Sequence, residues 1–173
     1  MEKIFEEEFR RRREVTNELN GFGYEKKYED IYNEFFKETG DGFFETKKDI
    51  LVLAAIIGFH LYSKQPNKIE NYKLEKNNFK LLSPVDFTEY YHLIYSVALS
   101  LNNDIKDVLN NSRIVEIFNK CAGLGIIKLK EILTKDSDGY IRNFEDFLEQ
   151  PEEFLEVMYD RDKEINEIMG IIS

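Results

Sequence analysis

The residue types that most often carry covalent chemistry are scarce in this 173-residue sequence. It contains one cysteine, Cys121, and two histidines, His60 and His92. Nucleophilic catalysis needs a nucleophile, a base and an orienting group held together. The thiol shares helical spacing with apolar residues, and each histidine stands near an otherwise apolar helix segment, which predicts a buried thiol and packed, hydrogen-bonded imidazoles. We therefore expect a protein that is not an enzyme.

One segment has the spacing of a calcium-binding loop between two helices. Counted from Thr134, the third and fifth positions are Asp136 and Asp138, and a glycine follows at the turn. The main chain of Tyr140 at the seventh position and the carboxylate of Glu145 at the twelfth complete the oxygen ligands that calcium prefers. The first position departs from the pattern because it is not an acid. An Asp–Gly turn between helices explains the same residues, and we expect no cofactor.

A run of four arginines, Arg10, Arg11, Arg12 and Arg13, has the charge needed to contact nucleic-acid phosphates. The glutamates at 6–8 stand four residues before the first three arginines. This order favours ion pairs along a helix, each worth about 0.3 kcal/mol. We favour a solvated, self-paired helix face, with a nucleic-acid-binding face as the alternative.

Length and composition fit one helical domain spanning residues 1–173. Hydrophobic residues make up 42% of the chain, which is enough for one continuous core, and three prolines are too few for a linker-rich chain. The net charge of −10 repels nucleic acid unless basic residues gather on one face. It is compatible with docking onto a basic partner, with an inhibitor that mimics DNA, or with simple solubility.

Helical spacing of apolar residues recurs along most of the chain and predicts an all-α bundle of about six to eight helices. Residues 63–82 lack this spacing and are expected to form an irregular loop, with at most a short hairpin turning at Asn77 and Asn78. The helices that we expect span, in order, residues 2–19, 24–38, 46–62, 83–101, 104–109, 112–133, 143–149 and 151 onward.

The segment 46–62 is the expected central helix. Thr46 followed by Asp49 has the spacing of a capping box, in which the hydroxyl accepts a hydrogen bond from a first-turn amide. The run Ile50–Phe59 is apolar on every side, which predicts that the other helices surround it. It is far shorter than the ~20 residues needed to span a bilayer.

Glycines stand in the middle of the helix expected over 112–133. Gly123 and Gly125 each destabilise a helix by about 1 kcal/mol relative to alanine. They therefore predict either a close helix crossing or a break between two shorter helices. Ser112 is the expected N-cap of this helix.

The lone cysteine cannot form an internal disulfide, and the first residues lack the apolar stretch of a secretory signal. Both observations favour a cytoplasmic protein that is not bound to a membrane.

Two stretches resemble a known family. The first is Phe-Glu-Thr-Lys-Lys-Asp-Ile-Leu-Val-Leu-Ala-Ala-Ile-Ile-Gly-Phe at 44–59, and the second is Ile-Phe-Asn-Lys-Cys-Ala-Gly-Leu-Gly at 117–125. Both are similar to segments of the accessory proteins associated with bacterial Dnd (DNA phosphorothioation) systems. The resemblance covers residues 24–133. It leaves out the charged N-terminal helix at 1–20 and the acidic C-terminal helices at 143–173.

The resemblance implies an accessory role in a bacterial DNA-modification or anti-phage defence system. The leading hypothesis is a non-enzymatic adaptor that binds partner proteins through an acidic helical surface. A nucleic-acid-binding subunit that uses the Arg10–Arg13 face, or an acidic inhibitor that mimics DNA, remains the alternative.

Overall fold

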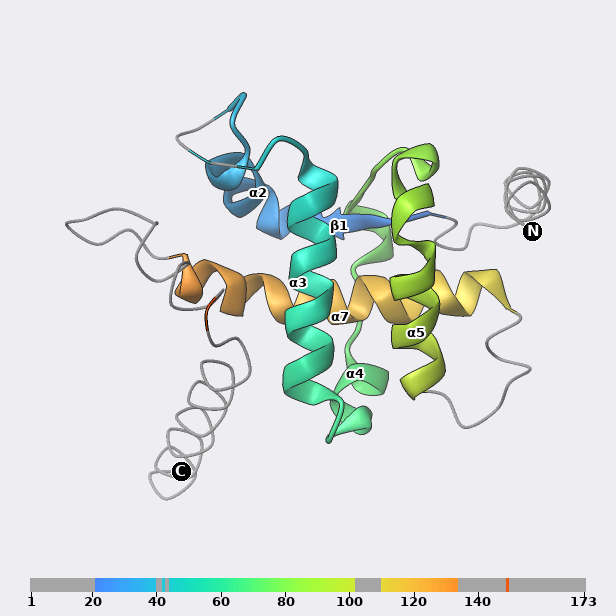
Figure 1. Cartoon of the computed structure of the whole chain (residues 1–173). Coiled ribbons are helices and arrows are strands. Elements are labelled where there is room, and N and C mark those ends of the chain that lie inside the picture. The colour runs from blue at the N-terminus through green and yellow to red at the C-terminus, as the bar shows by residue number, and fades with distance from the viewer. Residues whose placement is uncertain (1–20, 40–41, 43, 102–109, 134–148, 150–173) are drawn as a thin grey trace, which may run out of the picture.

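Two crossing helices, α3 (Lys47–Tyr62) and α7 (Asn111–Ile132), form the centre of the fold (Figure 1). The structure is a computed structural model that describes residues 21–39, 42, 44–101, 110–133 and 149. Apart from residue 149, the helices predicted over 1–20, 104–109 and 143–173 lie outside these residues, so they stay predictions.

The predicted central helix is confirmed with its expected start and end. The backbone N–H of Asp49 donates to Thr46 Oγ1 at 3.2 Å, and the Thr46 hydroxyl donates to Asp49 Oδ2 at 2.7 Å. These bonds satisfy an amide of the first turn that the helix itself leaves unpaired. As the apolar run predicts, buried side chains lie around most of α3: Ile50, Leu51, Val52, Ala54, Ala55, Ile57 and Leu61.

The long helix α7 continues through both of its glycines and crosses α3 at backbone distance. A Cβ atom added to Gly125 would lie 1.9 Å from the carbonyl oxygen of Ala54, and one added to Gly58 would lie 2.0 Å from that of Cys121. The close crossing is therefore the correct alternative, and the break is not. The N-cap prediction was wrong by two residues, because the side chain of Asn110 accepts from the backbone N–H of Ser112.

Three shorter α-helices pack around this pair. They are α2 (Glu29–Phe35), α4 (Pro66–Asn71) and α5 (Tyr91–Leu101). Three 3-10 segments accompany them: η1 (Lys26–Tyr28), η2 (Lys76–Asn78) and η3 (Pro84–Tyr90). The helix expected from residue 83 thus begins as a 3-10 segment and becomes α-helical at Tyr91. The described residues hold five α-helices, so the total of six to eight stays a prediction.

A two-stranded antiparallel sheet corrects the all-α expectation. β1 (Gly23–Glu25) pairs with β2 (Phe79–Leu81), with Tyr24 opposite Lys80. The helix predicted over 24–38 was therefore wrong at its start. The short hairpin, which was the alternative to an irregular loop at 63–82, does not form there, because β2 pairs with the distant strand β1. A mostly helical fold is confirmed. The helix α4 was not predicted, because it lies in a stretch that was expected to be irregular.

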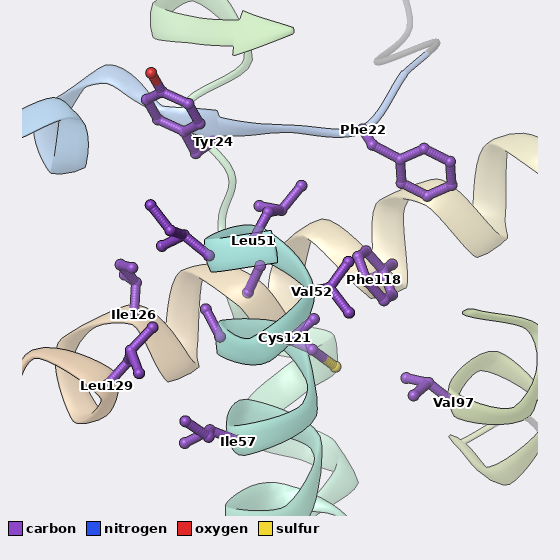
Figure 2. Close-up of a cluster of buried hydrophobic side chains, with 14 of the residues drawn as sticks. Phe22, Tyr24, Leu51, Val52, Ile57, Val97, Phe118, Cys121, Ile126 and Leu129 are labelled. Carbon is purple, nitrogen blue, oxygen red and sulfur yellow. The ribbon is translucent and has the colours of Figure 1, made fainter. Parts of the chain in front are cut away.

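The core extends from the crossing to the β1 segment, where it includes Phe22 and Tyr24 (Figure 2). Phe22 lies between Phe87 and Phe118, with ring centroids 4.6 and 5.5 Å away. The rings of Tyr24 and Tyr32 stack at 3.9 Å. In the described residues, no helix has both the length and the apolar character to cross a bilayer.

Candidate functional site

The residues predicted to bind nucleic acid or calcium lie outside the described part of the chain. They are Arg10, Arg11, Arg12 and Arg13 for nucleic acid, and Thr134, Asp136, Asp138, Tyr140 and Glu145 for calcium. Both hypotheses stay untested. Among the residues that are described, no group of three or more His, Cys, Asp or Glu side chains is arranged to hold a metal ion.

The candidate nucleophile and the candidate bases differ in burial. Cys121 is fully buried, and burial raises the pKa of its thiol to about 12. This confirms the predicted burial of the thiol. His60 on α3 and His92 on α5 are instead exposed, so the prediction that both imidazoles are packed was wrong. Their helices turn these two positions toward solvent, although the neighbouring residues are apolar.

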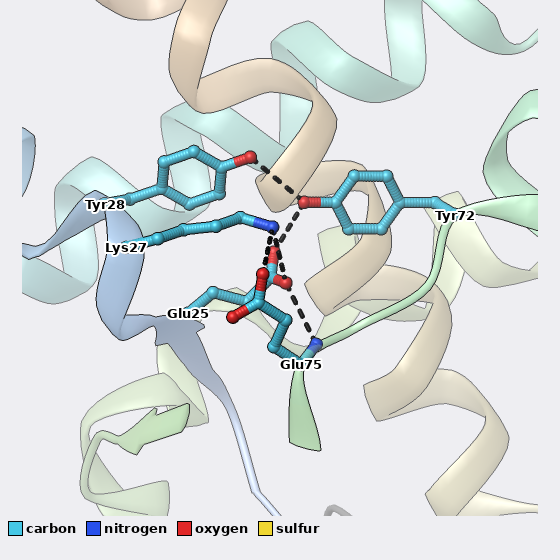
Figure 3. A network of polar contacts seen from close by, with 5 residues as sticks. All are labelled: Glu25, Lys27, Tyr28, Tyr72 and Glu75. Carbon is cyan, nitrogen blue, oxygen red and sulfur yellow. Dashed lines mark hydrogen bonds and ion pairs between the residues drawn. The ribbon is translucent and has the colours of Figure 1, made fainter. Parts of the chain in front are cut away.

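A buried carboxylate, Glu25 at the end of β1, organises a polar network among the described residues (Figure 3). Its side chain is 1% exposed. Glu25 Oε1 accepts from Lys27 Nζ at 3.0 Å and from the backbone N–H of Glu75 at 2.9 Å, while Oε2 accepts from the Tyr72 hydroxyl at 2.5 Å. The Tyr28 and Tyr72 hydroxyls are 3.2 Å apart. Each carboxylate oxygen therefore has a donor, as a buried charge requires.

Two groups of this network, Lys27 and Tyr72, have raised pKa values. Burial opposes the charge on Lys27, but hydrogen bonds to Glu25 and Glu75 outweigh it and raise the pKa of the ammonium. Burial and the hydrogen bond to Glu25 raise the pKa of Tyr72 well above its usual value. A general acid or base works best with a pKa near the operating pH. Lys27 and Tyr72 therefore suit a structural role better than proton transfer.

The network rests on α7 through Gly123. A Cβ atom at this glycine would lie 2.7 Å from the Tyr72 hydroxyl oxygen. The Lys27 ammonium lies 5.0 Å from the ring centroid of Tyr28 and 5.8 Å from that of Tyr72, within the range of cation–π attraction. The network thus joins β1 and η1 to the segment that follows α4.

A buried amide fixes the start of β1 on the same helix. Asn119, 2% exposed, accepts from the backbone N–H of Gly23 at 3.2 Å and donates to the carbonyl oxygen of Gly21 at 3.1 Å. The amide therefore takes the place of a neighbouring strand for this edge. A weak signal for this contact was present in the sequence, since Asn119 is a polar residue among the apolar positions of α7.

A second ionic cluster joins α4 to α7. Lys120 Nζ donates to the backbone carbonyl of Glu70 at 2.8 Å and lies 2.9 Å from Glu116 Oε1. Arg113 pairs with the Glu70 and Glu116 carboxylates. Lys120 is only 7% exposed. The Glu116 carboxylate neutralises its charge at this buried position.

Sequence reasoning missed the Glu25 network. Tyr24 and Tyr28 fall within the helix predicted over 24–38, and Tyr72 and Glu75 lie in the stretch expected to be irregular. The pattern of residue types contains no signal that one glutamate among 34 acids is buried.

The fold and its polar contacts define a helix-rich protein whose buried polar groups, among the described residues, hold distant segments together over one long helix. The family model described as DNA sulphur modification system-associated protein 4 matches residues 24–165. Because the match covers well over half of the 173 residues, the chain belongs to this family. The match confirms the resemblance carried by 44–59 and 117–125, and it extends beyond residue 133. No curated protein and no solved structure matches the chain.

Proposed function

We propose that this protein is a non-enzymatic accessory component of a bacterial DNA sulphur modification system and acts by binding other proteins of that system. Membership of the family supports the assignment to a DNA sulphur modification system. The non-enzymatic role is proposed because the buried polar side chains are engaged in structural contacts. Glu25, Asn119 and Lys120 each hold one segment of the chain to another, and the Cys121 thiol lies inside the core.

The distribution of charge supports binding to a basic protein surface. Residues 143–173 contain ten acids and two bases, which is a charge of −8 out of the net −10 of the chain. A segment with this density of charge attracts a basic surface and speeds the encounter with it. The acidic segment at 143–173 is therefore the proposed contact region.

Co-expression with the proteins of the host's DNA sulphur modification system tests this proposal. We expect at least one of them to co-elute with the purified chain at low salt. Co-elution should fall as salt rises, because the screening length shrinks from about 10 Å at 0.1 M to about 3 Å at 1 M. Failure of every protein of the system to co-elute at low salt would contradict the proposal.

Matched charge variants locate the contact. The triple change Glu152→Gln, Glu153→Gln and Glu156→Gln removes three charges from the acidic segment. The control triple change Glu38→Gln, Glu45→Gln and Glu89→Gln removes three from exposed positions of the described fold. We expect weaker co-elution for the first variant only. Equal weakening of both would argue against the acidic segment.

The same protein preparations separate the proposal from direct nucleic-acid binding. In a gel shift at low salt, the protein should not retard DNA. Retardation that disappears when Arg10, Arg11, Arg12 and Arg13 are changed to alanine would favour the nucleic-acid-binding alternative instead.

A further inference from the structure

The hydrogen bonds of the two-stranded sheet show which backbone groups point out of it. The backbone N–H of Leu82 donates to the carbonyl oxygen of Phe22 at 2.8 Å, in register with the β1–β2 pair. Hydrogen-bonded and non-hydrogen-bonded residue pairs alternate along an antiparallel ladder. The next pair, Gly23 and Leu81, is therefore not hydrogen-bonded across the sheet. The backbone N–H and C=O groups of both residues point to the outer edges.

The outer edge of β1 is closed, whereas that of β2 is open. The backbone N–H of Gly23 donates to the Asn119 side chain at 3.2 Å. By the same alternation, the backbone groups of Phe79 and Leu81 point to the outer edge of β2. Among the described residues, no strand lies beyond β2, and neither Phe79 nor Leu81 has a hydrogen-bond partner at that edge. An open strand edge pairs readily with another extended chain.

The segment that leads into this edge is basic, although the chain as a whole carries a net charge of −10. Residues 73–80 contain three lysines and one glutamate. Lys73 and Lys76 are exposed, and neither forms a salt bridge with another described residue. Lys80, in the middle of β2, is 44% exposed and pairs with Glu29. Its ammonium has three donors, so a second carboxylate can share it. The open edge therefore favours an acidic strand.

The other face of β2 is apolar and uncovered. Leu81 is 57% exposed, whereas most large hydrophobic residues of the described fold are buried or half-buried. Successive side chains of a strand alternate between faces, so Phe79 and Leu81 share one face and Lys80 lies on the other. A strand with an acid between two apolar residues matches both faces.

A second copy of this chain is a poor occupant of the edge. Antiparallel pairing of two β2 strands through Phe79 and Leu81 places the two Lys80 side chains directly opposite each other. Like charges in opposite positions destabilise a strand pair. The lysine thus disfavours self-pairing and favours a partner of opposite charge.

We propose that the outer edge of β2 binds an extended, acidic segment of a partner protein as a third, antiparallel strand. Phe79 and Leu81 exchange backbone hydrogen bonds with two apolar residues of that segment, and the acid between them faces Lys80. This interface is separate from the acidic segment at 143–173 and has the opposite charge. It therefore adds a second contact to the proposed protein-binding function.

A synthetic peptide, acetyl-Thr-Val-Glu-Val-Thr-amide, tests the edge when it is titrated into the full chain and followed by backbone amide NMR. The amides of Phe79 and Leu81 should shift saturably and gain protection from hydrogen exchange. The amide of Lys80, which already pairs with β1, should keep its protection. A peptide with lysine in place of its glutamate should bind about fivefold more weakly, because the cross-strand charge pair is lost.

Two protein variants separate the contributions of backbone and charge. Leu81→Pro removes an N–H that points out of the sheet, a position where strands tolerate proline, and should weaken peptide binding about tenfold. Lys80→Glu should reverse the preference, so that the lysine peptide binds more tightly than the glutamate peptide. Thermal unfolding without peptide checks that both variants are folded.

Modified peptides give a control that leaves the protein unchanged. Methyl groups on the amide nitrogens of both valines should abolish binding, because these N–H groups point at β2. A methyl group on the glutamate nitrogen should have little effect, because that N–H points away. Equal effects of the two methylation patterns, or no saturable shifts at Phe79 and Leu81, would overturn the proposal.

Two further measurements distinguish this interface from other contacts. Shifts of Phe79 and Leu81 that depend on protein concentration without peptide would mean that a second copy occupies the edge, which would contradict the proposal. The triple glutamine variant at 152, 153 and 156 should bind the peptide like the unmodified protein. The open edge and the acidic segment can therefore fail separately.

Discussion

The crossing of α3 and α7 and the Glu25 network both rest on α7, but different forces hold them. At the crossing, the two backbones approach so closely that Gly58 and Gly125 have no room for a side chain. At the network, distant segments are joined by hydrogen bonds to one buried carboxylate. The first contact depends on volume and the second on the satisfaction of charge.

The two glycines of α7 divide between these regions. A Cβ atom added at Gly125 would contact the backbone of Ala54, which cannot move without separating the helices. A Cβ atom added at Gly123 would contact the ring of Tyr72, which the hydrogen bond to Glu25 holds in place. A pair of glycines two residues apart thus serves both a dry crossing and a polar network, and the strength of each can be measured separately.

The largest effect is expected at the crossing. Gly125→Ala places a Cβ atom 1.9 Å from the Ala54 carbonyl oxygen, so the helices must separate. Overpacking of this severity should lower the free energy of unfolding by more than about 3 kcal/mol. Urea denaturation followed by circular dichroism measures it. Gly21→Ala is the control, because its nearest atom is Leu81 Cδ2 at 3.4 Å, and it should change stability by less than about 0.5 kcal/mol. A stable Gly125→Ala protein would show that the helices slide apart at little cost.

The polar network should give the next largest effect. Glu25→Ala takes from the Lys27 ammonium one of its two carboxylate partners. It also removes the oxygens that accept from the Tyr72 hydroxyl and from the backbone N–H of Glu75, and should lower the free energy of unfolding by about 3 kcal/mol. Differential scanning calorimetry provides the measurement. The control, Glu45→Ala, removes an exposed carboxylate that pairs with Lys37, and should have an effect below about 1 kcal/mol. Equal losses for both variants would remove the distinction between buried and exposed acids.

The smallest expected effect is a loss of stability at high pH, which comes from the thiol beside the crossing. The folded state raises the pKa of Cys121, beside the crossing, from 9.0 to about 12. The stabilisation that comes from the protonated, buried thiol is therefore complete below pH 9. It is lost as pH rises from 9 toward 12, because the unfolded chain releases the proton first. At pH 10 the loss should be about 1.4 kcal/mol relative to neutral pH.

Cys121→Ala provides the comparison for this pH dependence. The lysines and tyrosines titrate in both proteins, so their contributions cancel in the difference. Urea denaturation between pH 8 and 10 should show a shallower decline for the variant. Parallel declines would mean that the thiol ionises alike in the folded and unfolded states.

Local signals predicted the helical part of the fold well. Thr46 and Asp49 marked the start of α3, and the unbroken apolar run that follows predicted its burial on most sides. Gly123 and Gly125 predicted a close crossing as one of two alternatives. These predictions succeeded because capping and helical periodicity depend on residues within one or two turns of each other.

Long-range pairing was beyond such signals. Tyr24 fits the spacing of a helical stripe, yet it lies in β1 because Lys80 and its neighbours offer a strand to pair with. His60 and His92 were expected to be packed, and both are exposed. Whether a polar residue in an apolar helix faces the core depends on which helices pack against it.

The sequence by itself determined that α3 is an apolar helix with a capped start and that the chain is acidic, since these follow from neighbouring residue types. Only the tertiary structure decided which glutamate is buried and which asparagine holds a strand edge. The physical reason is that burial and charge pairing are properties of segments far apart in the chain. Their partners are chosen by packing, and periodicity within one segment carries no record of that choice.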